Sequence, residues 1–189
     1  MSEIAESYQR AADGFARRLA VVSGEQWESP TPCSDWSVRD LVAHVLDEQL
    51  WVPPLVGGET IAEVGDRFAG DQTGPDALAS WSSAQAGVLA ALAPDGATDR
   101  RVQLSFGETS AAEYVTQVTV DTVVHTWDLA RAVGVDDSLD PADVQAAIAA
   151  LSPQVEAWRA GGAFGPAVPV DPDADAQTRL LGMLGRDRG

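Results

Sequence analysis

Residues 120–134, VDTVVHTWDLARAVG, place an aspartate and a histidine within a largely apolar run. Asp121 and His125 stand four positions apart, with valines and a tryptophan around them. Residues three and four apart share one face of a helix, and a helix that is apolar on its other faces is normally buried. The segment therefore predicts a buried helix that directs a carboxylate and an imidazole toward the protein interior.

Glycine, proline and aspartate divide the rest of the chain into further helical blocks. We expect helices over residues 3–22, from Ser37 to about Trp51, from about 75 to 94, from 110 to 134, over 141–160, and near the C-terminus. Pro53 and Pro54 are expected to end the second helix, because proline lacks the donor that a helix interior requires. Residues 101–106 alternate in polarity, which is typical of a short strand or extended connector, and residues 55–74 are expected to be irregular. The pattern predicts an all-α helical bundle, as a single domain over residues 1–189.

Composition excludes several classes of protein. A net charge of −17 is the wrong sign for binding nucleic acid or anionic membrane surfaces. The first residues, MSEIAESYQRAADGF, lack the apolar segment of a signal peptide, and no run is long enough to span a bilayer. The single cysteine rules out an intramolecular disulfide framework and fits a reducing compartment. We expect a soluble cytoplasmic protein that acts on small molecules.

The chain has only two histidines, and both fall within apolar helical segments. His44 lies in VRDLVAHVLDEQLW, on a helical face with Leu41, Val45 and Glu48. A buried carboxylate such as Asp121 needs a cation, which is an arginine, a protonated histidine or a metal. Two histidines and one carboxylate from two helices suffice for a divalent metal and leave coordination positions open, as in catalytic sites. Spacing alone also allows a metal-free hydrogen bond or salt bridge between the same groups.

Other polar residues near these positions are each open to more than one interpretation. Asp128 and Glu48 each follow a candidate ligand by about one helical turn, so either could orient an imidazole or act as a general base. Either could equally be a solvated or arginine-paired carboxylate. Cys33, on a loop well before His44, is expected to pack as a small apolar side chain. The C-terminal arginines, Arg179 and Arg186, could reach the site and hold an anionic substrate, but no sequence pattern assigns them this role.

Two motifs together carry a family resemblance. TPCSDWSVRDLVAHV, followed later by DTVVHTWDLARAVG, resembles the DinB-like superfamily, in the branch related to the N-terminal domain of mycothiol-dependent maleylpyruvate isomerase. The resemblance implies a four-helix bundle of the DinB-like type, with a short extended segment and a short C-terminal helix. It also implies a divalent metal on three ligands, which match His44, Asp121 and His125. The isomerase usually has glutamate where Asp121 stands, and it has a separate C-terminal domain that we do not expect in a chain of this length.

The resemblance implies a thiol-dependent function. A metal at this site would activate a low-molecular-weight thiol such as mycothiol, for a transferase or isomerase reaction on a small molecule. The alternative is a non-catalytic metal-binding bundle, or a dimer stabilised by the metal, in which a fourth protein ligand closes the site. Zinc is the first expectation for a histidine and carboxylate set, with nickel, iron and manganese open. A homodimer is expected only because it is the commonest oligomer.

Overall fold

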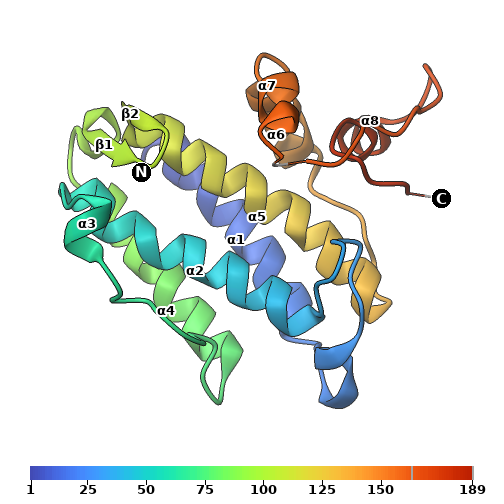
Figure 1. The fold of residues 1–189 in the computed structure, drawn as a ribbon, viewed down its shortest axis with the longest axis horizontal. Coiled ribbons are helices and arrows are strands. Elements are labelled where there is room, and N and C mark those ends of the chain that lie inside the picture. Colours follow the sequence, from blue (N-terminus) through green and yellow to red (C-terminus); the bar gives the residue numbers. More distant parts are fainter. Residues whose placement is uncertain (163, 189) are drawn as a thin grey trace.

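Four long helices lie side by side in the computed structural model, which describes residues 1–162 and 164–188 (Figure 1). They are α1 (Glu3–Leu19), α2 (Val38–Gly57), α4 (Ala77–Leu92) and α5 (Ala111–Val133). Helices α1 and α2 each pack against both α4 and α5, which closes the bundle. No helix within the described residues is long and apolar enough to cross a membrane. The predicted all-α bundle is confirmed.

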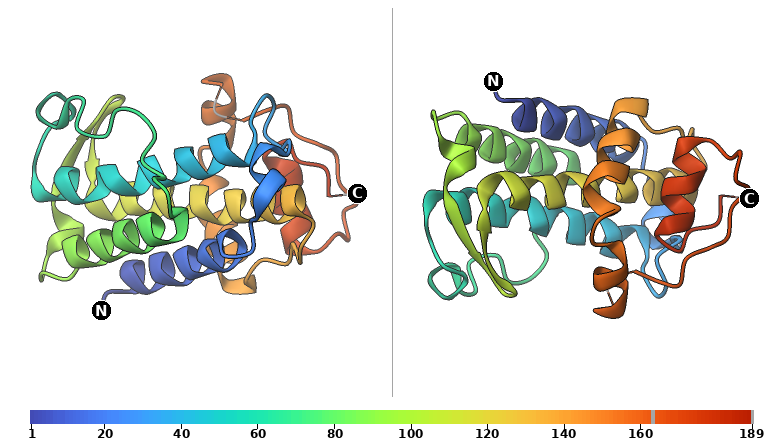
Figure 2. Two further views of the ribbon diagram at one scale, coloured as in Figure 1. Left: turned by 90° about the horizontal axis from the view of Figure 1, so that it is seen from below. Right: turned by 90° about the horizontal axis from the view of Figure 1, so that it is seen from above.

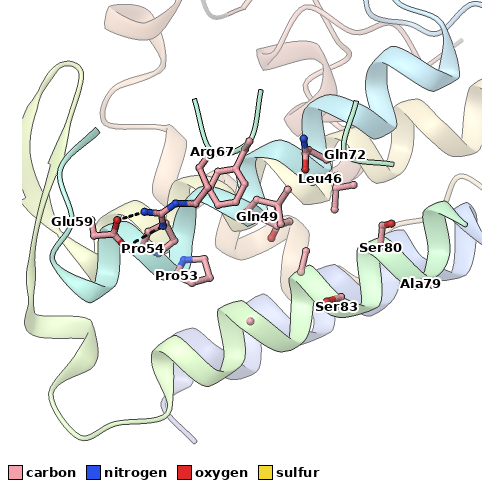
Figure 3. A pocket seen from close by; sticks show the side chains of 14 residues that line it. Leu46, Gln49, Pro53, Pro54, Glu59, Arg67, Gln72, Ala79, Ser80 and Ser83 are labelled. Carbon is pink, nitrogen blue, oxygen red and sulfur yellow. Dashed lines mark hydrogen bonds and ion pairs between the residues drawn. The ribbon is translucent and has the colours of Figure 1, made fainter. Parts of the chain in front are cut away.

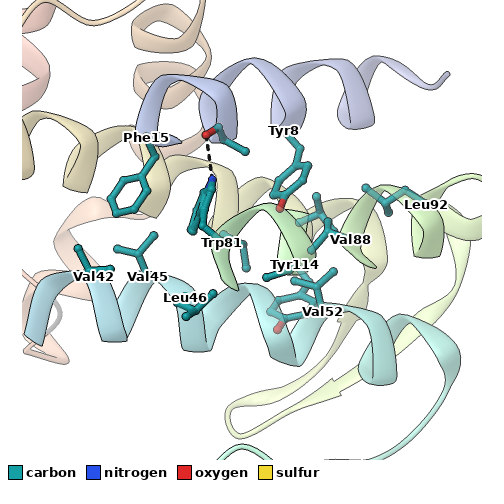
Figure 4. Close-up of a cluster of buried hydrophobic side chains, with 14 of the residues drawn as sticks. Tyr8, Phe15, Val42, Val45, Leu46, Val52, Trp81, Val88, Leu92 and Tyr114 are labelled. Carbon is teal, nitrogen blue, oxygen red and sulfur yellow. Dashed lines mark hydrogen bonds between the residues drawn. The ribbon is translucent and has the colours of Figure 1, made fainter. Parts of the chain in front are cut away.

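The core of the bundle combines side chains from all four helices (Figure 4). Phe15 of α1 packs on Trp81 of α4 with ring centroids 4.5 Å apart. The indole N–H of Trp81 donates to the carbonyl of Ala12 at 3.2 Å, so the polar atom of this fully buried side chain has a partner. Leu46 of α2 and Tyr114 of α5 close the core from the opposite side.

The helix ends follow the signals in the sequence. Ser37 Oγ accepts a hydrogen bond from the backbone N–H of Asp40 at 3.3 Å, and the Asp40 carboxylate accepts one from the N–H of Ser37 at 2.9 Å. At the start of α5, Ser110 caps the N–H of Glu113 at 3.1 Å. Gly134 ends α5 in the left-handed conformation, with φ of 76°, which glycine adopts without strain. These caps fix the boundaries of the two helices that carry the candidate ligands.

Replacing Ser37 with Ala is expected to lower the free energy of unfolding by about 1 kcal/mol, because the first turn of α2 loses its cap. Urea denaturation of the two proteins measures the difference. Ser82→Ala is the control, since Ser82 is exposed within α4 and alanine is the better helix former. Equal losses in both variants would contradict the capping role of Ser37.

The prolines at positions 53 and 54 do not end α2, so that prediction was wrong. The helix continues to Gly57, and Gly58 closes it in the left-handed conformation with φ of 101°. The residues around and after the prolines, Val52, Leu55 and Val56, are buried. Their packing offsets the helical hydrogen bonds that the two prolines cannot donate.

The second half of the chain also departs from the predicted boundaries. The helix expected over 141–160 is two helices, α6 (Pro141–Leu151) and α7 (Val155–Ala160), because Pro153 interrupts it. The expected irregular segment contains the short helix α3 (Ile61–Val64). The predicted extended segment is β1 (Arg101–Leu104), and it pairs antiparallel with β2 (Gly107–Ser110), a strand that alternation did not reveal. The C-terminal helix was correctly predicted and is α8 (Ala176–Met183).

Helices α6 and α8 cover the side of α5 that faces away from α1 and α2 (Figure 2). Val120 and Val124 of α5 form a second apolar cluster with residues of the later helices, which include Val144, Leu151 and Leu180. This second layer explains why α5 is apolar around its whole circumference. The helix is buried on both sides, and its polar side chains must find partners within the protein.

Candidate metal centre

The contact between α2 and α5 brings together the three side chains that the sequence singled out. Asp121 lies between the two histidines, with its Oδ2 3.4 Å from His44 Nε2 and its Oδ1 3.3 Å from His125 Nε2. The two imidazole rings meet nearly edge to face, with centroids 5.2 Å apart. One ligand atom from each residue lies within 4.8 Å of the other two. His44 reaches the cluster from α2, and the other two residues come from one face of α5.

The donor atoms of this cluster fit a divalent metal. Asp121 Oδ2 is buried, yet it makes no hydrogen bond of acceptable geometry. A buried carboxylate oxygen without a donor is costly unless a cation compensates it. Imidazole nitrogens and a carboxylate oxygen are the ligands that zinc and related metals take in proteins. The side chains of His44 and Asp121 are 32% and 33% exposed, so the cluster is open to solvent on one side.

The three groups and their neighbours shift one another's protonation. Burial alone would raise the pKa of Asp121, but the charge and hydrogen bond of His125 and the contact with His44 hold it well below its usual range. Burial would lower the pKa of His125, but the carboxylates of Asp121 and Asp128 raise it well above its usual value. Burial and the charge of Asp121 raise the pKa of Glu48. The cluster therefore places an ionised Asp121 beside a histidine that favours its proton, and a divalent metal would take the place of that proton.

Asp128 holds the far side of the His125 ring. Its Oδ2 lies 2.9 Å from His125 Nδ1, and its side chain is fully buried. Because Nδ1 faces Asp128, the other ring nitrogen faces Asp121. Ligand histidines in metal proteins are commonly fixed by a carboxylate in this way. Both Asp128 and Glu48 were considered from the sequence as carboxylates that could orient an imidazole. Asp128 has such a contact, with His125 Nδ1. Glu48 interacts with the cluster through its charge.

Cys33 lies closer to the cluster than its distance along the chain suggested. Its loop folds back against α5, and Sγ lies 3.3 Å from Asp128 Oδ2 and 3.7 Å from His125 Nδ1. The turn is made possible by Asp35, whose φ of 65° is left-handed, a conformation that aspartate tolerates better than most residues. Cys33 is partly buried against the core, as expected, but it also joins the group on the Nδ1 side of His125. The Cys33 sulfur is not part of the group formed by His44, Asp121 and His125.

One further residue of the site, Trp36, was not predicted from the sequence, and Arg186 was considered there only as a side chain that could hold an anionic substrate. The Trp36 ring lies over both imidazoles, 4.8 Å from His44 and 5.8 Å from His125 between centroids. Arg186 donates to both oxygens of Asp128, at 2.9 Å from Nε and 2.7 Å from Nη2. Arg179 instead donates to the carbonyl of Ala174. Trp36 could have been placed near the site from the sequence, because it lies in the loop just before the helix that carries His44. No local sequence pattern predicts the position of Arg186.

A hollow of about 830 Å³ lies between α2 and α4, away from this cluster (Figure 3). Leu46 and Pro53 of α2 line it, together with Arg67 and Phe68 of the segment that follows α3. At 100° per residue, positions 46 and 53 lie on the face of α2 opposite His44. The hollow is therefore separate from the candidate metal centre.

The protein is an all-α bundle with a cluster of two histidines and one carboxylate. These residue types are those of a metal site, and the cluster is open to solvent on one side. The sequence model for the mycothiol maleylpyruvate isomerase N-terminal domain matches residues 8–130. The chain belongs to this family. Its resemblance to the branch of the DinB-like superfamily that contains this domain is thereby confirmed.

Relatives and solved structures agree with the family. Two proteins of Mycobacterium tuberculosis, named uncharacterized protein MT0763 (strain CDC 1551 / Oshkosh) and Rv0738 (strain H37Rv), are each 31% identical over 185 residues, which cover 95% of this chain and 96% of theirs. The crystal structure of the mycothiol-dependent maleylpyruvate isomerase superposes with a TM-score of 0.67 at 18% identity, over 90% of this chain and 75% of that one. A histidine-to-alanine mutant of that isomerase gives the same values. The similarity to these structures extends the shared fold beyond the matched domain.

Proposed function

We propose that the protein is a metal-dependent enzyme that uses a low-molecular-weight thiol, such as mycothiol, in a transferase or isomerase reaction on a small molecule. His44, Asp121 and His125 hold the metal. The observation that carries the proposal is the convergence of three ligand atoms around a buried carboxylate oxygen that makes no hydrogen bond, with His44 Nε2 3.4 Å away. Membership of the mycothiol maleylpyruvate isomerase N-terminal domain family supports the thiol as co-substrate.

Each residue of the site has a distinct part in this function. When bound, the metal would stabilise the thiolate of the co-substrate and act as a Lewis acid. His125 supplies a fixed ligand because Asp128 holds its Nδ1. Trp36 covers the two imidazoles and limits the approach of water from its side. The exposed parts of His44 and Asp121 leave the opposite side open to the thiol and its substrate.

The number of protein ligands supports an enzyme over a non-catalytic metal-binding protein. Within the described residues, the group around Asp121 offers three ligand side chains, and Cys33 belongs to a second group that includes Asp128. Three ligands leave positions for exchangeable partners, whereas structural zinc sites have four. We take zinc as the first candidate metal, with nickel, iron and manganese as alternatives.

The metal is tested by elemental analysis of the native protein, purified without a histidine tag, beside His44→Ala. We expect about one metal ion per chain in the native protein and loss of the metal in the variant, because His44 is the ligand contributed by α2. Circular dichroism checks that the variant remains folded. A native protein that contains no metal and takes none up on incubation would refute the metal centre and leave Asp121 as part of an ion pair with the two histidines.

The thiol is tested separately on the metal-loaded protein. Replacing the metal with cobalt provides a visible spectrum that changes when a thiolate enters its coordination shell. We expect mycothiol to change the spectrum and its S-methyl derivative to leave it unaltered. A loaded protein whose spectrum responds to neither compound would support the non-catalytic alternative.

A further inference from the structure

Arg186 is held rigidly at the far side of the candidate metal centre. Besides its two bonds to Asp128, it donates from Nη1 to the carbonyl of Leu184 at 3.2 Å. Its backbone N–H donates to the carbonyl of Leu181, at the end of α8, at 2.9 Å. Its side chain is 13% exposed. The guanidinium is thus fixed by its own segment before it meets the carboxylate.

This arginine controls the orientation of a carboxylate that is completely buried. Asp128 is inaccessible to solvent, and its described partners are Arg186, His125 and Cys33. A planar guanidinium that donates to both oxygens fixes the plane of a carboxylate, which a single point charge does not. With that plane fixed, Oδ2 is directed at His125 Nδ1. The orientation of the His125 ring therefore depends on Arg186, which lies 58 positions beyond Asp128 in the chain.

We propose that Arg186 is a positioning residue of the metal centre. It acts through Asp128 to fix the His125 ring with Nε2 toward Asp121, so that the C-terminal segment after α8 is a working part of the site. This inference rests on the proposed metal-binding function. A ring that is already oriented binds a metal more tightly than one that must be ordered on binding.

The same geometry excludes the alternative role for this side chain. An arginine that binds an anionic substrate must present free N–H groups to the open side of the site. Arg186 directs Nε and Nη2 at Asp128 and Nη1 at Leu184, and it stands on the Nδ1 side of His125. The open side is formed by His44 and Asp121. Arg186 thus acts on the metal centre through Asp128, on the Nδ1 side of His125 and away from the open side of the site.

The experiment measures zinc affinity by competition with a chromophoric chelator for the native protein, Arg186→Met and Arg188→Met. Arg188 is the matched control, because it fastens the same segment through Asp175 and Asp137 and makes no contact with Asp128. We expect Arg186→Met to weaken zinc binding about 10- to 100-fold, as when an orienting partner of a ligand is removed. Arg188→Met should retain native affinity, and Arg186→Lys should recover only part of the loss. Native affinity in Arg186→Met, or equal losses in the two methionine variants, would overturn the proposal.

Proton and nitrogen NMR provides a readout that does not depend on metal. The chain has only two histidines, so the His125 ring is assigned by comparison with His44→Ala. In the metal-free native protein we expect a downfield, slowly exchanging Nδ1 proton, because Asp128 accepts it. Arg186→Met should lose this signal to exchange with water, and its persistence would contradict the positioning role. A native protein that binds no zinc yet loses this signal in Arg186→Met would refute the proposed function while retaining the positioning role.

Arg186→Met leaves the buried Asp128 charge without its arginine, and an unpaired buried charge can by itself prevent folding. The double variant Arg186→Met with Asp128→Asn removes both charges and keeps an oxygen that can accept from His125 Nδ1. We expect it to fold and still bind zinc more weakly than the native protein, because no guanidinium fixes the amide. Native affinity in the folded double variant would overturn the proposal.

Discussion

Replacing His125 with Ala is expected to abolish stoichiometric metal binding. The variant loses a ligand that is buried and held from behind by Asp128, and two side chains that are each about one third exposed remain. Two exposed donors do not retain a divalent metal through dialysis, because the open coordination positions are filled by water. Elemental analysis after incubation with zinc and dialysis measures the effect, and the expected content falls from about one ion per chain to background.

Cys33→Ser is the matched control for His125→Ala. Cys33 also lies beside Asp128, but it faces His125 Nδ1, and a serine hydroxyl can still donate to the same carboxylate. We expect the serine variant to retain its metal. If His125→Ala kept one ion per chain, the proposed ligand set would be wrong. If Cys33→Ser alone lost it, the ligands would lie in the group formed by Cys33, His125 and Asp128.

Replacing Trp81 with Ala is expected to lower the free energy of unfolding by about 3–5 kcal/mol, the range for a large aromatic removed from a core. Trp81 has no solvent exposure, packs on Phe15 and donates its indole N–H to the carbonyl of Ala12. The variant loses apolar contacts with α1 and leaves that carbonyl without this donor. Since domains are stable by only about 5–15 kcal/mol, the loss is a large share of the total. Urea denaturation followed by circular dichroism measures it.

Two variants separate this effect from a general sensitivity to tryptophan loss. Trp81→Phe keeps most of the apolar volume and should cost less than Trp81→Ala. Trp158→Ala removes a partly buried ring that packs near Phe164, outside the four-helix core, and should also cost less. A loss for Trp81→Ala no larger than that for Trp158→Ala would contradict the central position of Trp81.

The helices and the candidate ligands were predictable because their signals are local. The caps at Ser37 and Gly134 are decided within a few residues, and the backbone geometry confirms both. Asp121 and His125 share a face because they are one helical turn apart, which holds for any helix that contains them. Their approach to His44 required only that α2 and α5 be neighbours, which the family resemblance implied.

The features that were missed depend on distant parts of the chain. Pro53 and Pro54 are tolerated within α2 because the residues around them are buried, and burial is a property of the whole fold. The contact of Arg186 with Asp128 is set by how α8 packs on α6 and α6 on α5, and no short pattern encodes it. Cys33 reaches Asp128 only because its loop reverses direction. Linear spacing sets an upper limit on distance and says little about where a loop returns.

The ligands of the candidate centre come from two different helices of the bundle, with His44 on α2 and Asp121 and His125 on α5. A metal held by both helices is a removable cross-link between segments that are distant in the sequence. By mass action, an occupant that binds only the folded state adds about 2.7 kcal/mol to stability when its free concentration is a hundredfold above its dissociation constant. The melting temperature of such a protein is then a gauge of free metal in its surroundings, and a chelator acts on it as a denaturant.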